Sequence, residues 1–421
     1  MDATTIPTPT SHDEYELPRE VRTVRVNRLK ARRAMASSDE LLMKKHCIFA
    51  QLQHETRGWS GVALRRGHVA KGHGGQKRAF KVKLVGEGVN DYSGPYREVF
   101  TDALAEVAST TDSGKSVLGI LEPTPNNSAE IGEDRSLLMF GRGNASVDSD
   151  KNEFPNMLTE EENSIMNAFS SIVGNRDESV REIEDSLVFL GRLTGTACRH
   201  GIPVDLPLST ANVWKRISEE TVDPVASLAE IDLLASHELM KGQDNSNQLL
   251  QTQQRMLNSF TEGLSSVIPT EIFSIFSGEE VRNKICGNPE IDVGLLQRVV
   301  EYDGYDESSP VITYFWEVLR EMNDRERKLF LQFVWARSRL PLKESDFDAP
   351  FKIQKDMKTR SQGNDGLPGA STCFFSLTLP EYKSKEILKQ KLMFAIENVT
   401  TMESDYVTND AEVSEGWRGL Y

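Results

Sequence analysis

The sequence has few cysteines, no paired cysteine motif and no long apolar run. Its 421 residues include only four cysteines, Cys47, Cys198, Cys286 and Cys373, and no Cys-x-x-Cys pair. That spacing fits neither a disulfide framework nor a zinc site, and it is typical of a reducing compartment, cytosolic or nuclear. No stretch reaches the roughly 20 apolar residues of a membrane span, and the polar N-terminus lacks an apolar signal segment. We expect a protein with no metal site, no cofactor and no membrane segment.

Histidine is missing from the last 184 residues, because the seven histidines end at His237. A thiol protease needs a histidine to form its thiolate, so a dyad with Cys373 would have to be built across domains. This argues against a thiol protease. A thiol that only receives an acyl group from another thioester needs less, namely accessibility and partial thiolate character.

Charge is unevenly distributed along the chain. The formal net charge is −15, yet residues 19–83 contain 17 Lys and Arg against 4 Asp and Glu, a local +13 that leaves −28 on the remainder. The block lacks interleaved aromatic residues and a recognised binding motif, which disfavours nucleic acid as a partner. We expect a solvated basic helix that faces an acidic partner surface or the acidic remainder of the chain. Gly86 and Gly88 lack a correctly placed third glycine, so nucleotide binding is not expected either.

Hydrophobic spacing predicts a mainly helical first part and a smaller mixed second part. Residues 1–18 are expected to be disordered, and 109–155 to hold loops and short strands. In the first part the predicted elements are helices over 19–56, 96–107, 160–173, 180–199 and 249–267 and a strand over 79–85. A second unit is predicted after the Gly, Ser and Pro interruption at 302–310, with helices near 311–319, 327–334 and from 384, a surface loop over 352–366 and a strand over 374–379.

Cys373 differs from the other three cysteines in its surroundings. Those three lie in apolar helical patterns, where a free cysteine packs as a small hydrophobe. Cys373 follows a Pro-Gly-Ala-Ser-Thr loop and precedes a strand, so rigid flanks could hold its thiol at the surface. Phe374 and Phe375 are expected to point to opposite faces of that strand, so that one could serve as a contact surface, but simple core packing of both is favoured.

The segment 367–382, LPGASTCFFSLTLPEY, resembles the catalytic segment of HECT-type ubiquitin ligases, and it is most similar to the large HERC-like branch. Further blocks occur in the order found in that family, at 83–98 (KLVGEGVNDYSGPYRE), 189–195 (FLGRLTG), 285–292 (ICGNPEID), 302–305 (YDGY), 315–316 (FW) and 329–341 (LFLQFVWARSRLP). The resemblance covers about residues 44–408.

This resemblance implies an α+β, bilobal enzyme. It implies a basic lead over 1–44, a large helical N-lobe over 45–301, a hinge over 302–310 containing Tyr302, Gly304 and Tyr305, and a small α/β C-lobe over 311–421. Ubiquitin would pass from a conjugating enzyme to Cys373 as a thioester and then to lysines of protein substrates. Thr372 would support the thiol by orienting it, and the tail 412–421 could assist the final transfer.

Two departures from the family pattern are visible. Ser371 stands where the family commonly has histidine. Only 15 residues, 234–248, occupy the place of a longer segment that grips the conjugating enzyme in the family. The donor-docking subdomain is therefore expected to be truncated. The alternative function is an interaction scaffold that keeps the fold but has impaired ubiquitin loading.

Overall fold

The structure is a computed structural model of the chain. It describes residues 21–37, 39–69, 77–87, 94–111, 114–132, 134–142, 160–242, 247–288, 290–347, 349–356, 366–372 and 374–398, with the backbone alone over 160–177 and at 247. Among the described helices, none combines the length and apolar character needed to cross a membrane. The lead 1–18 and the tail 412–421 lie outside the described residues.

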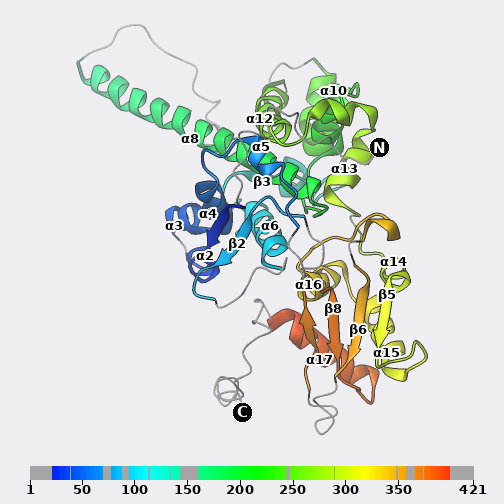
Figure 1. Ribbon diagram of the computed structural model, residues 1–421. Coiled ribbons are helices and arrows are strands. Elements are labelled where there is room, and N and C mark those ends of the chain that lie inside the picture. Colours follow the sequence, from blue (N-terminus) through cyan, green and yellow to red (C-terminus); the bar gives the residue numbers. More distant parts are fainter. Residues whose placement is uncertain are drawn as a thin grey trace.

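The buried apolar side chains form two separate clusters that divide the chain. The first runs from Val24 to Cys286, and the second from Ile291 to Ile396. Figure 1 shows the same division, with a larger helical unit coloured blue to green and a smaller unit around a sheet coloured yellow to red. An α+β fold with a large helical unit and a small mixed unit is confirmed. We call these the first unit and the second unit.

The first unit is built mainly of helices with two small sheets. β1 pairs with β2 in parallel, and β3 pairs with β4 antiparallel. Its elements are β1 (Thr23–Val26), α2 (Arg28–Met35), α3 (Glu40–His46), α4 (Ile48–Glu55), α5 (Gly61–Leu64), β2 (Lys81–Leu84), α6 (Gly94–Val107), β3 (Leu121–Pro123), α7 (Pro125–Ser128), β4 (Leu138–Phe140), α8 (Glu160–Arg199), α9 (Lys215–Ile217), α10 (Pro224–Ile231), α11 (Leu233–Met240), α12 (Asn247–Ser265) and α13 (Gly278–Cys286).

The helices α8 and α12 form the centre of the first unit, and two glycines let them touch. A Cβ atom added at Gly263 of α12 would lie 1.8 Å from the carbonyl oxygen of Val188, and one at Gly191 of α8 would lie 2.0 Å from that of Phe260. No side chain fits at such distances, so glycine at both positions sets how closely the backbones approach. Figure 1 shows α8 crossing beside α12 and continuing well beyond it.

The N-terminal basic block does not form the single helix expected over 19–56. It folds as β1, α2, α3 and α4, because Asn27, Asp39 and Cys47 each cap the N-terminus of the following helix with a side-chain acceptor. Val24 and Val26 of β1 are fully buried, so the first core begins ahead of the expected boundary at residue 45. Caps between short helices are weak signals beside an apolar stripe, which is why the sequence pattern was misleading here.

The second unit places a four-stranded sheet against helices. The strand order is β5-β6-β8-β7, with β7 antiparallel to β8 and the other pairs parallel. Its elements are α14 (Val293–Arg298), β5 (Val300–Asp303), α15 (Pro310–Glu321), α16 (Asp324–Trp335), β6 (Phe351–Lys355), β7 (Gly369–Ser371), β8 (Ser376–Leu379) and α17 (Lys385–Asn398). Figure 1 shows β5, β6 and β8 side by side, with the helices gathered around them.

The surface loop expected over 352–366 was wrong at its start, because β6 is an inner strand of this sheet. Phe351 and Ile353 of β6 are fully buried, while Lys352 and Gln354 alternate with them on the more exposed side. The lysine and aspartate content of the segment obscured this short alternation. Residues 357–365 lie outside the described part of the chain.

Candidate functional site

The segment predicted to carry the reactive cysteine is a tight hairpin between β7 and β8. Ser371 pairs with Ser376 across the two strands, and the Phe374 N–H donates to the Ser371 carbonyl at 3.1 Å. The loop between them therefore consists of residues 372–375, and we call it the cysteine turn. Thr372 is buried. Cys373 itself lies outside the described residues, so its role stays a prediction.

The two phenylalanines of the cysteine turn have opposite environments. Phe374 is 54% exposed, whereas Phe375 is 1% exposed and stacks on Trp335 with 4.1 Å between ring centroids. Phe375 adopts a φ of +50°, which is uncommon for a bulky residue and is held here by its packing. One ring lies in the core and the other at the surface, whereas core packing of both was favoured from the sequence, and the strand begins two residues later than expected.

The cysteine turn is anchored from two directions. Within the second unit, the Lys352 N–H of β6 donates to the Phe375 carbonyl at 2.9 Å. From the first unit, Arg97 of α6 donates through Nη2 to the Thr372 carbonyl, and Thr101, one helical turn later, donates to the Ala336 carbonyl at 3.1 Å. The family-like block 83–98 contains Arg97, but no role for it was predicted. Arg97 and Thr101 form a polar pair four residues apart, yet α6 also carries Glu98, Asp102 and Glu106, so the pair was not a distinctive signal.

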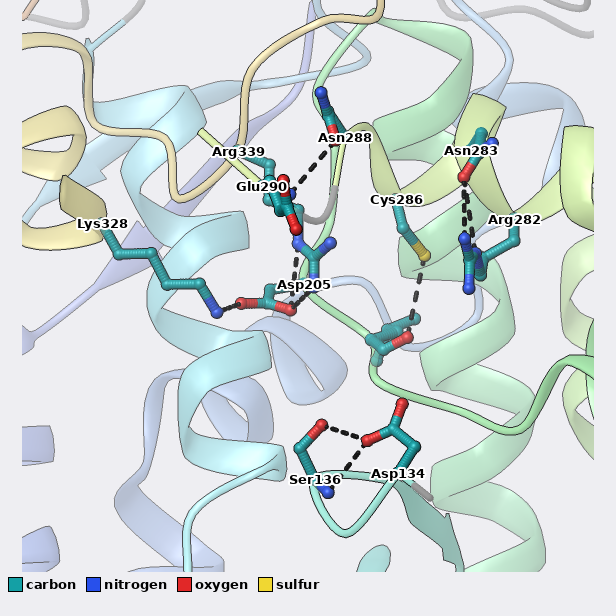
Figure 2. Close-up of polar contacts among 11 residues, drawn as sticks. Asp134, Ser136, Asp205, Arg282, Asn283, Cys286, Asn288, Glu290, Lys328 and Arg339 are labelled. Carbon is teal, nitrogen blue, oxygen red and sulfur yellow. Dashed lines mark hydrogen bonds and ion pairs between the residues drawn. The ribbon is translucent and has the colours of Figure 1, made fainter. Parts of the chain in front are cut away.

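A second contact between the units centres on Asp205. Lys328 of α16 donates to this carboxylate at 2.7 Å, and Arg339, after the same helix, donates through Nε at 3.0 Å. Figure 2 shows Lys328 and Arg339 reaching Asp205 from two sides. Burial raises the pKa of Asp205, but the charges of Arg339 and Lys328 more than reverse this, so its pKa lies below the ordinary value. The aspartate is therefore ionised at neutral pH and links the two units.

The other three cysteines are poor nucleophiles. Cys47, Cys198 and Cys286 are buried. Burial, with a smaller contribution from the charge of Glu106, raises the pKa of Cys47 to about 12, and burial likewise raises that of Cys286 to about 12. The expectation that these three pack as small hydrophobes is confirmed. In the described part of the chain no three His, Cys, Asp or Glu side chains gather as metal ligands would.

The residues expected to form the hinge lie inside the second unit. Tyr302 belongs to β5 and pairs with Ile353 of β6, and the Tyr305 hydroxyl donates to the Leu379 carbonyl at 2.9 Å. Gly304 supplies the positive φ of +77° in the turn between them. The change from one core to the other falls instead between Cys286 and Ile291. The Gly and Ser content of 302–310 reflects a turn within the sheet unit.

The segment expected to be truncated is a short connection between helices. α11 ends at Met240 and α12 begins at Asn247, with residues 243–246 outside the described part. Leu234 and Met240 on α11 are 61% and 68% exposed. A direct helix-to-helix connection leaves apolar side chains uncovered at this end of the first unit.

Comparison with known proteins bears on this arrangement of two units and a cysteine hairpin. The family model described as HECT-domain (ubiquitin-transferase) matches residues 243–405, which include the whole second unit. The chain carries a HECT domain. It is HERC-like, since the chain is 28% identical to the human E3 ubiquitin-protein ligase HERC2 over 374 residues, 78% of the chain and 7% of that protein.

Other relatives match shorter stretches of the chain at higher identity. The Arabidopsis thaliana E3 ubiquitin-protein ligase UPL2 is 37% identical over 185 residues, 43% of this chain and 5% of that protein. The mouse E3 ubiquitin-protein ligase HUWE1 is 38% identical over 145 residues, 34% of this chain and 3% of that protein. The chain thus spans less than a tenth of the length of these curated relatives. The α+β fold of two units is the HECT fold.

Proposed function

We propose that the chain is a ubiquitin-protein ligase that accepts ubiquitin from a conjugating enzyme as a thioester on Cys373 and transfers it to lysines of protein substrates. The observation that supports this proposal is the hairpin between β7 and β8, because the short stretch of sequence between the two strands contains Cys373 and the exposed Phe374. The HECT domain match supports the same chemistry, as do the names of the relatives.

The reaction requires little of the protein beyond a positioned thiolate. The thiolate of Cys373 attacks the carbonyl of the thioester that joins ubiquitin to the conjugating enzyme. The cysteine thiolate of the conjugating enzyme is the leaving group. A lysine amine then attacks the new thioester, forming an isopeptide bond and releasing the Cys373 thiolate. Thiol exchange of this kind depends on thiolate fraction and access, which suits a cysteine in a part of the sequence that contains no histidine.

A single-turnover assay tests the proposal. The chain is mixed with a conjugating enzyme preloaded with ubiquitin, and a ubiquitin adduct that disappears under reducing agent is followed on a gel. We expect the adduct with the wild-type chain and none with Cys373→Ala. Cys198→Ala is the matched control, because Cys198 is buried. An adduct that persists in Cys373→Ala would assign the thioester to another residue.

The short connection between α11 and α12 favours a second candidate, an interaction scaffold with impaired loading. HECT ligases, as the resemblance implies, use a longer segment here to hold the conjugating enzyme. In this reading Cys373 remains reactive while donor docking fails. The same assay separates the two, since slow Cys373-dependent loading that rises steeply with donor concentration supports impaired docking. Efficient loading at low donor concentration contradicts it.

A further inference from the structure

Arg97 of α6 reaches across the junction between the two units to the peptide group that joins Thr372 to Cys373. Its Nη2 donates to the Thr372 carbonyl, 275 residues away in sequence. The carbon of that carbonyl is bonded to the backbone nitrogen of Cys373. The contact therefore bears on the backbone of the predicted nucleophile, and this holds whatever the position of the Cys373 side chain.

Arg97 is buried where it makes this contact, so the hydrogen bond is shielded from solvent. Arg97 is 3% exposed and Thr372 is 7% exposed, so water screens the guanidinium charge weakly there. A hydrogen bond from a charged donor is stronger than a neutral one. It also polarises the peptide it binds, so that the N–H of the same peptide becomes a better donor. Here that N–H belongs to Cys373.

The neighbouring contacts indicate that the arrangement is fixed. Thr101, on the same face of α6, binds the Ala336 carbonyl at 3.1 Å, and Trp335 beside Ala336 stacks on Phe375 of the cysteine turn. One face of α6 therefore contacts the cysteine turn through Arg97 and, through Thr101, contacts Ala336, which adjoins the Trp335 ring that packs on Phe375. The lysine and arginine contacts of Asp205 join the units at a different place.

We propose that Arg97 is a positioning residue for Cys373: its hydrogen bond to the Thr372 carbonyl fixes the cysteine turn and places a positive charge at the peptide group that joins Thr372 to Cys373. The meaning of this contact for ubiquitin transfer rests on the proposed function, but the effect on the thiol does not.

Alkylation of Cys373 measures the effect without ubiquitin or a conjugating enzyme. The intact chain is treated with iodoacetamide, which is neutral, and separately with iodoacetate, which is negative, and labelling is quantified by peptide mass spectrometry. The buried Cys47, Cys198 and Cys286 report any unfolding by becoming labelled. A nearby cation both favours the thiolate and attracts the negative reagent.

Arg97→Met is expected to slow labelling of Cys373 by iodoacetamide about tenfold at neutral pH, equivalent to roughly one unit of thiol pKa. It is also expected to lower the ratio of iodoacetate to iodoacetamide rates, which a merely loosened turn would leave unchanged. Arg97→Lys keeps the charge and should restore most of that ratio. If Arg97→Met labels the buried cysteines, Arg97→Gln replaces it, because glutamine keeps an N–H donor but not the charge.

Asp205→Asn is the matched control, since it breaks the other contact between the units and leaves Arg97 in place. Wild-type rates and ratio in a folded Arg97→Met or Arg97→Gln variant would overturn the proposal. If Asp205→Asn lowered the labelling rate and the reagent ratio as much as the Arg97 variants do, the proposal would also be overturned. The effect would then come from contact between the units in general and not from Arg97. A shifted reagent ratio in a chain that forms no thioester would refute the proposed function and leave the role of Arg97 intact.

Discussion

Asp205 of the first unit forms an ion pair with Arg339 of the second unit, and Lys328 completes the bridge. Arg339 is 10% exposed in its side chain and Asp205 25%, so the pair is only partly screened by solvent. Val204 and Leu206 on either side of Asp205 are buried in the first core. The bridge therefore connects a fixed part of one unit to the helix α16 of the other.

Asp205→Asn should destabilise the docked pair of units by about 1 kcal/mol at neutral pH, because two cations lose their charged acceptor. The folded pKa of Asp205 lies below its ordinary value of 3.8, so this stabilisation is present above that value and is lost as pH falls through the folded pKa. Urea unfolding of both proteins from pH 7 downward measures it. The difference should shrink in acid.

Glu344→Gln is the control for Asp205→Asn. Glu344 pairs with Arg298 inside the second unit, and both side chains are 55% exposed. Exposed pairs contribute little, so this variant should unfold as the wild type does. A difference between wild type and Asp205→Asn that is constant with pH would contradict the ion-pair explanation.

Phe375→Ala should remove the stack on Trp335 and destabilise the second unit by roughly 3–5 kcal/mol, as large-to-small changes of buried phenylalanine do. The neighbouring Phe374 is the matched control, because it is the same residue type at 54% exposure. Phe374→Ala should change stability by less than about 0.5 kcal/mol. Denaturant unfolding of the two variants decides the matter, and equal destabilisation would show that the two rings share one environment.

The sequence predicted the two-unit fold and the strand after Cys373, but neither β7 nor the contacts between units. Apolar spacing located α6, α15, α16 and α17 because each buries one regular face. Arg97 and Asp205 carried no such pattern, since their partners lie 275 and 134 residues away. The hinge was predicted at 302–310 from glycine and serine content, and these residue types mark a tight turn and a flexible connection equally well. Local sequence describes local structure, whereas docking of units depends on distant pairs.

Glu106→Gln should change how stability varies with pH. The Glu106 carboxylate accepts from the Phe49 N–H at 3.0 Å, at the start of α4. Burial raises its pKa to about 7 from 4.5, even though backbone hydrogen bonds from Ile48 and Phe49 act to lower it. A raised folded pKa contributes stability at low pH and loses it as pH rises through the folded value.

The wild type should therefore lose stability relative to Glu106→Gln between about pH 5 and pH 8, by on the order of 1 kcal/mol. Thermal unfolding at several pH values in that window measures the trend. Glu184→Gln serves as control, since Glu184 lies in an ion pair with a largely exposed arginine. If the stability difference between wild type and Glu106→Gln instead grew as pH falls, its pH dependence would have the opposite sign and the explanation would be refuted.

Gly263→Ala should force α8 and α12 apart. The added methyl group would lie 1.8 Å from the Val188 carbonyl oxygen, so the helices must shift, at a cost of about 1–3 kcal/mol or more. Ser265→Ala, at the end of α12, is the control, because Ser265 is only partly buried and its hydroxyl donates locally to the Glu262 carbonyl. Circular dichroism during urea unfolding should show a lower midpoint for the glycine variant alone.

The connection between the units gives a further contrast between two glycines. The change of core between Cys286 and Ile291 predicts that relative motion of the units is centred there and not at the expected hinge over 302–310. Gly304 lies within the second unit at a φ of +77°, with a Cβ position 3.0 Å from Lys355 Cβ. Gly287, at a φ of +72°, would place its Cβ 2.7 Å from the Leu340 carbonyl oxygen. Alanine at either position would be strained. At Gly304 the strain falls within the second unit, and at Gly287 it falls on the connection between the units.

Spin labels at Lys115 and Glu307, in a Cys373→Ser background, would report the distance between the units, because Lys115 lies in the first unit and Glu307 in the second and both are exposed. Gly304→Ala should lower the unfolding midpoint of the second unit and leave the distance distribution unchanged. Gly287→Ala should shift or broaden that distribution, since the connection must move away from Leu340. The opposite result, a changed distribution with Gly304→Ala alone, would return the hinge to 302–310 and would require β5 to separate from β6 during motion.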